Sequence, residues 1–319
     1  MNVDRGTLLV RDGYSHYPQT RSEHRIFPGD ANRPTRILVV DGSGGVTFDV
    51  IDWLREQDIP LMRVDWRGAV TVISGHNSYA ADPTAWRRQE ALRADPKRRL
   101  AIARCIIEEK LQNTLATLET QLPASPKRTL AAEVILEKLA LLKSRKALDV
   151  PALHGIEGRA AKVYFNAWTG TPLSWSDSKR HPIPEAWRTI GQRQSFTTGK
   201  KGKNRDASHP INAMLNYTYA VLEGQVRLDV LAHGYDPRAG FLHSGYRESD
   251  ALVLDLMEPL RPKADAAVLE FAQAAVFSGA DFVLRSDGVV RLSPQLSRVI
   301  VARLDHGQTM TAPMKRPRA

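Results

Sequence analysis

Short apolar runs rich in β-branched residues dominate the first part of the chain. Residues 7–10 and 36–40 are two such runs, and each is closely followed by Asp-Gly, a strong turn signal. Residues 61–66 alternate between apolar and polar positions, and residues 69–73 form another β-branched stretch that stops at Ser-Gly. The pattern therefore predicts that residues 1–80 are mostly strands.

One short helix is expected between these strands, after residue 47. Thr47 is a suitable N-cap, and Val50, Ile51 and Leu54 fall on one helical face. The glycine-rich tract at 42–45 before it lacks the lysine of a phosphate-binding P-loop and the spacing of a dinucleotide fingerprint. A plain tight turn is the better interpretation of this tract.

The pattern changes to helical spacing after residue 80. Ala81-Asp82-Pro83 is typical of a linker, and the residues that follow are rich in strong helix formers. The predicted fold class is α+β, with a small N-terminal β-rich domain at 1–80, a linker at 81–85 and a larger, mostly α-helical C-terminal catalytic domain at 86–306. Residues 307–319 are predicted to form a basic, disordered tail. The helices are predicted at 84–94, 97–122, 128–145, 157–170, 209–233, 249–259 and 264–278.

The excess of basic residues suggests that the protein binds a polyanion. The chain has 45 Lys and Arg against 35 Asp and Glu, a net charge of +10 and a pI near 9.8. Such an excess favours nucleic acid or an anionic membrane surface, although a merely soluble basic protein has the same balance. The hydrophobic fraction of 42% is enough for a packed core, so the chain is expected to be globular rather than disordered.

The single cysteine, Cys105, excludes an internal disulfide and any zinc site built on cysteine pairs. It lies in an apolar helical run, so its thiol is expected to be buried. The longest apolar run is far below the ~18 residues of a membrane span, and the first residues lack the pattern of a signal peptide. We therefore expect a cytoplasmic protein that has no membrane partner.

Glu157 stands in an unusual place for an acidic residue. In a helix it shares a stripe with Ala160, Ala161, Tyr164 and Trp168, whose small or aromatic side chains mark a buried face. A carboxylate on such a face is costly unless it is paired or binds a metal ion. The alternative is that Glu157 lies at the helix N-terminus, half exposed and stabilised by the helix dipole.

A second acidic pair lies in an apolar helix further along the chain. Asp255 and Glu258 are three residues apart and so share a helical face among Leu, Val and Met. His243 precedes a polar loop that can fold back towards this helix. One imidazole with carboxylate oxygens suits Mg²⁺ or Mn²⁺ better than a structural zinc site. Alternatively, His243 is a core histidine, and the two acids form salt bridges with Arg247 or Arg261.

Taken together, these segments resemble the CRISPR-associated spacer-acquisition integrase family. The N-terminal half agrees through a strand, a Gly-rich turn, a Thr-capped helix and then Ile59-Pro60-Leu61-Met62. The resemblance therefore spans nearly the whole chain. Four motifs carry it, in the family's order: 157–165 (Glu-Gly-x-x-Ala-x-x-Tyr-Phe), 210–219, 234–243 (ending in His243) and 251–262 (Ala-Leu-Val-Leu-Asp-Leu-Met-Glu-Pro-Leu-Arg-Pro).

The resemblance implies a metal-dependent DNA endonuclease and integrase. The family's metal ligands and catalytic residues fall on Glu157, His243 and Glu258, and Asp255 falls on an auxiliary acidic position. With Mg²⁺ or Mn²⁺ as cofactor, such an enzyme joins a short DNA fragment to a CRISPR array by attack of a 3′-hydroxyl on a phosphodiester. The implied partners are double-stranded DNA, a second copy of the chain in a homodimer, and a small ferredoxin-like CRISPR-associated adaptation protein.

A basic segment at 179–205 is the expected contact with DNA. It combines Gly and Ser with many Lys and Arg, which suits phosphate contacts. Trp175, Trp187 and Phe196 lie in and beside it and offer base stacking; the alternative is a solvated loop that these aromatics anchor. A second basic cluster within 87–99 is expected on a solvated helix face; the alternative is that it borders a DNA path. The DNA-binding candidates are Arg193, Lys200, Lys201, Lys203 and Arg205.

Two other functions stay open on the sequence. A general metal-dependent nuclease that acts on branched DNA in repair would use the same ligands, and gene neighbourhood would separate it from an integrase. A non-catalytic DNA-binding scaffold would have lost a ligand, whereas all three candidate ligands are present.

Overall fold

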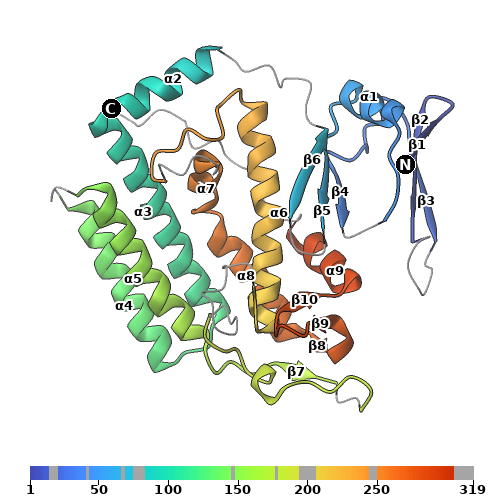
Figure 1. Cartoon of the computed structure of the whole chain (residues 1–319). Coiled ribbons are helices and arrows are strands. Elements are labelled where there is room, and N and C mark those ends of the chain that lie inside the picture. Colours follow the sequence, from blue (N-terminus) through green and yellow to red (C-terminus); the bar gives the residue numbers. More distant parts are fainter. Residues whose placement is uncertain are drawn as a thin grey trace.

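Figure 1 shows the computed structural model, in which the N-terminal strands stand beside a body of helices. Short sheets occupy the N-terminal part and helices make up most of the rest, which confirms the predicted α+β fold class. The structure describes residues 1–13, 21–40, 43–65, 69–74, 83–144, 148–176, 179–193, 206–243 and 250–304.

The first sheet contains the strands β1 (Asn2–Asp4), β2 (Thr7–Asp12) and β3 (Ser22–Ile26). They are antiparallel, with β2 in the middle. The turn between β1 and β2 is tight, and Gly6 there has a φ of +75°, a conformation that glycine adopts without a steric penalty. Leu8 of β2 points into the protein and is fully buried.

The second sheet contains β4 (Ile37–Val40), β5 (Leu61–Val64) and β6 (Val70–Ser74). Strands β4 and β5 are parallel, and helix α1 (Phe48–Glu56) connects them, since a parallel pair needs a crossover. Strand β6 pairs with β5 in the antiparallel sense. Helix α1 begins after Thr47 as predicted, although the Thr47 side chain makes no capping hydrogen bond.

Helix α1 joins the two sheets through a small hydrophobic core. The indole N–H of Trp53 donates to the Gly6 carbonyl at 2.9 Å and so connects α1 to the first sheet. The buried residues of this core are Leu8, Val50, Trp53, Leu54, Ile59 and Leu61.

Local capping sets where the long helices begin. The side chains of Asp95, Ser125, Asp149 and His209 accept backbone N–H groups at the starts of α3, α4, α5 and α6, and a proline lies in the first turn of each. The helices after the sheets are α2 (Pro83–Ala94), α3 (Pro96–Gln121), α4 (Pro126–Lys143), α5 (Val150–Trp168), α6 (Pro210–Ala232), α7 (Ala251–Met257), α8 (Arg261–Ala274) and α9 (Pro294–Leu304).

The structure differs from the predicted elements at the start of α5 and in several strands. The helix predicted at 157–170 is α5, which begins at Val150, so Glu157 lies in its interior and not at its N-terminus. Beyond α8 the chain forms strands and α9, which the predicted elements did not include. Strands of two or three residues are too short to show an alternating pattern. These strands are β8 (Val276–Phe277), β9 (Phe282–Leu284) and β10 (Val290–Leu292), with β7 (Ser174–Trp175) earlier in the chain.

The prediction that Cys105 is buried is wrong. Helix α3 turns Ala103, Ile106 and Ile107 into the protein, and Cys105 lies on the opposite, exposed side. The apolar run that contains the cysteine is longer than one helix face, so it does not fix which of its residues point inward.

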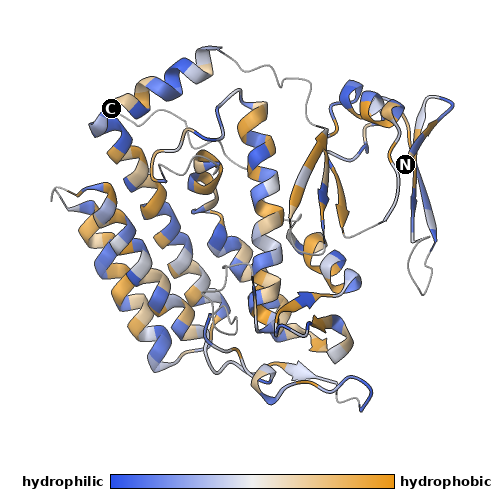
Figure 2. Ribbon diagram, in the orientation of Figure 1, coloured by the Kyte–Doolittle hydropathy of each residue, from blue (hydrophilic) through white to orange (hydrophobic). Residues whose placement is uncertain are grey.

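The long helices share one large hydrophobic core. Helix α4 packs on α5, α3 packs on α4, α5 and α8, and α6 packs on α7 and α8. Figure 2 shows hydrophobic positions along each of the long helices. Among the fully buried side chains of this core are Ile107, Leu111, Ile135, Trp168, Met214, Phe241 and Leu252.

The second sheet is packed closely against α6. A Cβ atom placed on Gly224 of α6 would lie 2.6 Å from Val70 Cγ1 and 3.1 Å from Met62 Sδ, so any larger residue there would require its neighbours to shift. Val64 of β5 belongs to the large helical core. The domain boundary at 81–85 remains a prediction, and the predicted tail at 307–319 lies outside the described residues.

Candidate functional site

Glu157 points from the interior of α5 towards a lysine of α3. The buried stripe of α5 includes Ala160, Tyr164 and Trp168, as predicted, while the Glu157 side chain is 24% exposed. Its Oε1 accepts a hydrogen bond from Lys110 Nζ at 2.5 Å. Because Glu157 lies in the third turn of the helix, an ion pair and not the helix N-terminus compensates its charge.

Lys110 joins two of the predicted ligands. Its Nζ also donates to Oε2 of Glu258, which follows the end of α7 and is almost fully buried. Arg261 Nη1 lies 3.5 Å from the other oxygen of Glu258. Burial opposes the charge on Glu258, but Arg261 and Lys110 outweigh it and lower the pKa of the carboxyl.

Asp255 holds His243 in one orientation. Its fully buried carboxylate accepts the backbone N–H groups of Phe241, Leu242 and His243 and lies 2.7 Å from His243 Nδ1. The hydrogen bond to Asp255 raises the pKa of His243 against the opposing effect of burial. With Nδ1 engaged by Asp255, Nε2 is the nitrogen available to a metal ion. The His243 ring also lies edge-on to His154 of α5, with centroids 5.5 Å apart, one turn before Glu157.

Helices α2 and α3 fix the backbone that leads to His243. Gln89 donates to the Asp236 and Ala239 carbonyls, at 2.9 and 2.8 Å. Arg93 Nε donates to the Gly240 carbonyl. In the same way, Arg99 Nε donates to the carbonyl of Phe241 at 2.9 Å. The expectation of a wholly solvated basic face within 87–99 is therefore wrong for these two arginines.

The donors at this site suit a hard divalent cation. Two carboxylates converge on one cationic position, and an oriented imidazole lies beside them. In the described part of the chain, no three His, Cys, Asp or Glu side chains already stand close enough to hold an ion. Instead the Lys110 ammonium occupies the position between the carboxylates. The assignment of Glu157, His243 and Glu258 as metal ligands remains a prediction that fits the chemistry of the donor set.

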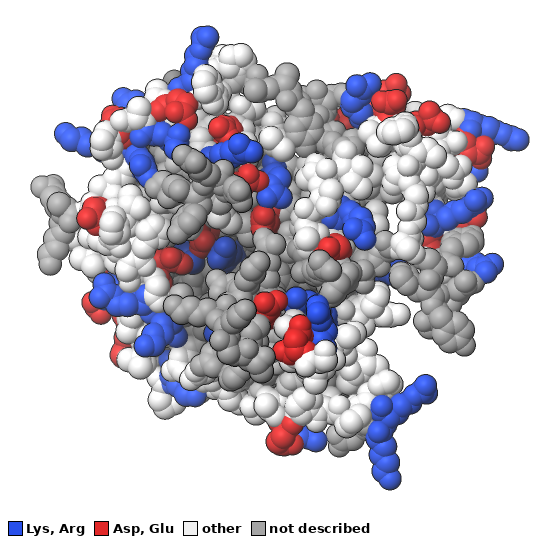
Figure 3. Space-filling model, in the orientation of Figure 1, with Lys and Arg blue, Asp and Glu red and all other residues white. Residues whose placement is uncertain are grey.

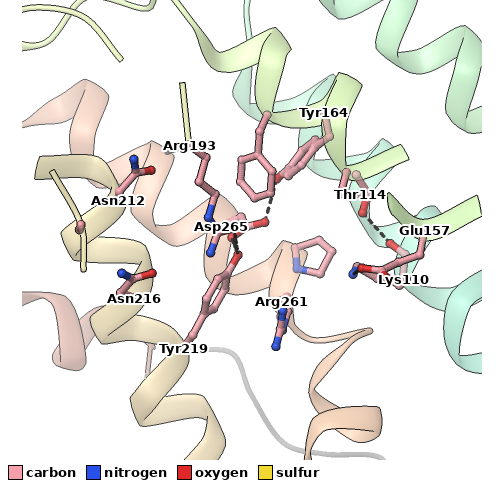
Figure 4. Close-up of a pocket in the computed structure, with 14 residues that line it drawn as sticks. Lys110, Thr114, Glu157, Tyr164, Arg193, Asn212, Asn216, Tyr219, Arg261 and Asp265 are labelled. Atoms are coloured by element: carbon pink, nitrogen blue, oxygen red, sulfur yellow. Dashed lines mark hydrogen bonds and ion pairs between the residues drawn. The ribbon is translucent and has the colours of Figure 1, made fainter. Parts of the chain in front are cut away.

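A polar pocket of about 290 Å³ adjoins Lys110 and Glu157. Figure 4 shows its side chains converging from several helices. Three of them are cationic, Lys110, Arg193 and Arg261, and the buried Nε of Arg261 has no hydrogen-bond partner among the described residues. The lining residues are Lys110, Thr114, Glu157, Ala161, Tyr164, Phe165, Arg193, Ala207, Asn212, Asn216, Tyr219, Arg261, Pro262 and Asp265.

Asp265 is a buried residue that lines this pocket. It accepts a hydrogen bond from Tyr164 Oη at 3.1 Å and another from Tyr219 Oη. Burial raises the pKa of Asp265 to about 6, although the two hydroxyls and the nearby arginines favour its charged form. Tyr219 in turn lies beneath both guanidinium groups, with Arg193 Cζ 5.1 Å and Arg261 Cζ 5.2 Å from its ring centroid.

Of the predicted DNA contacts, the structure describes Arg193 alone. Its guanidinium stacks on the Phe165 ring, with Cζ 4.5 Å from the centroid, and lines the pocket. Lys200, Lys201, Lys203 and Arg205 lie outside the described residues. Figure 3 shows, on the described part of one face, Lys and Arg interspersed with Asp and Glu rather than gathered into one basic patch.

Two of the aromatic residues proposed for base stacking have another role. Trp187 is buried, and Trp175 packs beside it with ring centroids 5.8 Å apart. Both rings also contact Phe282, so they anchor the segment to the C-terminal strands. The stacking interpretation is wrong for the buried Trp187, whereas the partly buried Trp175 has the anchoring contacts of the alternative interpretation. Phe196 lies outside the described residues.

Lys110 is the site residue that the sequence interpretation missed. It lies in the 97–122 helix, 47 residues from Glu157 and 148 from Glu258. The sequence did contain a feature that could have identified Lys110: it lies with Ile106, Ile107 and Leu111 on the apolar side of that helix. A lysine in that setting needs a buried anionic partner.

Comparison with known proteins gives the family. The family model described as CRISPR associated protein Cas1 matches residues 31–306. The CRISPR-associated endonuclease Cas1 1 of Archaeoglobus fulgidus is 27% identical to this chain in an alignment that covers 95% of this chain and 84% of the relative. Among the described residues, no helix is both long enough and apolar enough to cross a membrane.

Solved structures agree on the fold. A casposase bound to integration product has a TM-score of 0.71 and 24% identity, and the match covers 95% of this chain and 78% of the casposase. A chain of a Cas6-RT-Cas1–Cas2 complex has a TM-score of 0.67 and 18% identity, and the match covers 97% of this chain and 31% of that one. At these identities the likeness concerns the fold alone, but the family match extends over most of the sequence. The chain therefore belongs to the Cas1 family of CRISPR-associated proteins.

Proposed function

We propose that this protein is a metal-dependent DNA endonuclease and integrase that inserts short foreign DNA fragments into a CRISPR array. The observation that supports this most is the convergence of Glu157 and Glu258 on one cationic position, beside an imidazole that Asp255 orients. The endonuclease name of a relative and the integration product bound to the similar casposase point the same way.

Glu157, His243 and Glu258 would bind Mg²⁺ or Mn²⁺ through carboxylate oxygens and the His243 Nε2 atom. A bound divalent ion would stabilise the negative charge on the oxygens around phosphorus during phosphoryl transfer. Asp255 engages Nδ1, so the neutral His243 ring would present the lone pair of Nε2 to a metal ion. Asp255 is therefore an auxiliary residue that acts through His243.

The pocket beside these residues suits the DNA phosphate that reacts. In the proposed step, the 3′-hydroxyl of the incoming fragment gives up its proton as its oxygen forms a bond to phosphorus. The bond from phosphorus to the neighbouring 3′-oxygen of the array strand breaks, and that leaving oxygen takes up a proton. Arg261 lines this pocket. Burial opposes its charge, but Glu258 and other neighbouring groups raise its pKa, so it stays a cation that can pair with phosphate.

DNA beyond the pocket would run along the basic 179–205 segment. Arg193 connects this segment to the pocket, because it stacks on Phe165 and lines the cavity. We expect Lys200, Lys201, Lys203 and Arg205 to contact phosphates and not bases, so that they add affinity with little sequence preference. We expect the protein to act in the cytoplasm, where array DNA would be found.

Assembly with other subunits is the remaining part of the proposal. A solved Cas6-RT-Cas1–Cas2 complex contains a chain of similar fold, which supports Cas2 as a partner of this protein. We expect that partner to be the small ferredoxin-like adaptation protein. For the homodimer we propose the N-terminal β-rich part, where Phe48 is 85% exposed beside Val46. Phe48→Asp should lower the mass of the full chain measured by light scattering, and an unchanged mass would place the dimer contact elsewhere.

A strand-transfer assay tests the proposed function. The purified protein, the small partner and a pre-spacer duplex are incubated with a supercoiled array plasmid, with and without Mn²⁺. Joining should require the metal and should be lost in Glu157→Ala, His243→Ala and Glu258→Ala, each checked for folding by circular dichroism. Glu137→Ala is a matched control because Glu137 is an exposed acid on α4. Joining by Glu157→Ala at the wild-type rate would contradict the assignment.

A further inference from the structure

The Lys110 ammonium occupies the position that a metal ion on Glu157 and Glu258 would take. Nζ donates to Oε1 of Glu157 and to Oε2 of Glu258. The Lys110 side chain is only 11% exposed, and that of Glu258 is 4% exposed. An ion bound by the same two oxygens needs the space between them, so the ammonium and the ion exclude each other.

We propose that Lys110 is a built-in counter-ion that competes with the divalent metal for Glu157 and Glu258 and sets the metal affinity of the site. This rests on the proposed function, which assigns these carboxylates to the metal. The device keeps two adjacent carboxylates neutralised while the metal is absent. Two such groups largely removed from water would otherwise repel each other and raise the free energy of the fold.

Metal binding would require the ammonium to leave. A divalent ion and an ammonium on the same two oxygens would be a few ångströms apart, where like charges repel strongly in a poorly solvated site. The lysine side chain is a flexible four-carbon stem, and the pocket of about 290 Å³ next to it gives the displaced ammonium room. Displacement costs free energy, and that cost lowers the apparent affinity for the metal.

Titration of the full-length protein with Mn²⁺ alone, by calorimetry at one pH and ionic strength, tests this inference. Lys110→Met keeps the length of the side chain and removes the ammonium. We expect it to lower the Kd for Mn²⁺ by about tenfold, the size of an ordinary coupling between two ligands. In thermal unfolding, Mn²⁺ should also raise the Tm of Lys110→Met more than that of the wild type.

Two control variants separate competition from more general effects. Lys138→Met removes another buried lysine, whose side chain is also 11% exposed but pairs with Glu137 on α4, and it should leave the Kd for Mn²⁺ unchanged. Arg261→Met removes a neighbouring cation, 3.5 Å from Glu258, without vacating the position between the carboxylates. Its gain in Mn²⁺ affinity should be clearly smaller than that of Lys110→Met.

The proposed competition would be overturned if Lys110→Met bound Mn²⁺ with the wild-type Kd or a higher one. It would also be overturned if the Kd of Lys110→Met fell no further than that of Arg261→Met. If Lys110→Met does not fold without metal, Lys110→Gln, which keeps a hydrogen-bond donor but no charge, is titrated in its place with the same expectation. Glu157→Gln and Glu258→Gln keep the two proposals distinguishable. If both bind Mn²⁺ like the wild type, the metal site of the proposed function is wrong, whereas loss of binding in both with no gain in Lys110→Met overturns the counter-ion alone.

Discussion

Three buried acidic side chains of this protein are stabilised in three different ways. Asp255 accepts three backbone N–H groups and lies in hydrogen-bond contact with the His243 ring, Glu258 pairs with Lys110 and Arg261, and Asp265 accepts two tyrosine hydroxyls. A buried carboxylate without such partners would be strongly destabilising. At the residue scale, the partners of each carboxylate therefore indicate its role. Asp255 orients His243, Glu258 binds a cation, and Asp265 shapes the pocket.

Asp255→Asn should weaken both the fold and the metal site. The amide nitrogen cannot accept the hydrogen bonds that the carboxylate accepts, and losing bonds to a charged acceptor costs about 1.5–3 kcal/mol. Because His243 loses its orientation, the affinity for Mn²⁺ should fall roughly 10–100-fold, whereas His243→Ala should abolish binding. Urea unfolding and calorimetry measure the two effects.

Asp281→Asn is the control for this pair of measurements. Asp281 also accepts a backbone N–H, from Ser278 at 2.7 Å, but it lies in the C-terminal segment beyond α8. Its replacement should reduce stability and leave Mn²⁺ binding unchanged. Unaltered Mn²⁺ binding in Asp255→Asn would show that His243 does not depend on Asp255.

Asp265 predicts a pH dependence of stability with a definite sign. Burial raises its pKa to about 6 from 3.8, so the folded state binds this proton more tightly than the unfolded state. The stabilisation is fully present below pH 3.8 and is lost as the pH rises through about 6. Asp265→Asn does not titrate. The unfolding free energy of the variant minus that of the wild type should increase over this window by on the order of 3 kcal/mol. Urea unfolding at a series of pH values would contradict this if the difference stayed constant.

At the element scale, one short segment before His243 determines where the His243 side chain lies. Residues 236–243 contain little regular structure, yet α2 and α3 hold their carbonyls and Asp255 of α7 holds their N–H groups. Local sequence predicted the helices on either side because their apolar patterns are long. Local sequence did not predict the hydrogen bonds from Gln89, Arg93 and Arg99 to this segment. In the sequence these residues look like ordinary surface residues of a helix, and only the fold shows that the segment lies beside them.

Gly240→Ala should displace this segment. A Cβ atom there would lie 2.7 Å from the His243 carbonyl oxygen and 2.8 Å from Ala251, both backbone groups that cannot turn aside. We expect a loss of about 1–3 kcal/mol in stability from the crowding and a clear loss of Mn²⁺ affinity.

Gly158→Ala is the matched control, since a Cβ on this helical glycine beside Glu157 meets nothing within 4 Å. It should stabilise α5 by up to about 1 kcal/mol and leave metal binding unchanged. Wild-type Mn²⁺ affinity in Gly240→Ala would show that the site tolerates a shifted segment.

At the scale of the whole molecule, the sheet of β4, β5 and β6 and the helical body are packed as one unit across α6. Gly224 allows α6 to approach Val70 and Met62, and Val64 contributes to the helical core. The sequence predicted both the strands and the helix from their periodicities. The contact between them depends on a glycine in a long helix, which by itself indicates only lower helix propensity.

Gly224→Val should therefore loosen the sheet from α6. The added side chain overlaps Val70 Cγ1, so either the sheet or the helix must shift, at a cost of about 1–3 kcal/mol. Urea unfolding followed separately by tryptophan fluorescence and by far-ultraviolet circular dichroism should give lower midpoints than in the wild type. An unchanged midpoint would mean that β6 moves aside at no cost.

The candidate site shows the same division between what the sequence predicts and what only the fold reveals. Glu157, His243, Asp255 and Glu258 were identified from acidic or imidazole side chains in apolar surroundings and from the family resemblance. Lys110 escaped because a lysine in a charged helix is usually solvated, and its two partners are 47 and 148 residues away. Long-range ion pairs of this kind do not follow from periodicity.

The most direct test of the account is a crystal structure of the protein with Mn²⁺, in which the anomalous signal locates the ion. One Mn²⁺ peak is predicted, bound by Glu157, His243 Nε2 and Glu258, with the Lys110 ammonium withdrawn from between the carboxylates towards the pocket. A peak elsewhere, with Lys110 still paired to both Glu157 and Glu258, would contradict the proposed metal site and the competition together.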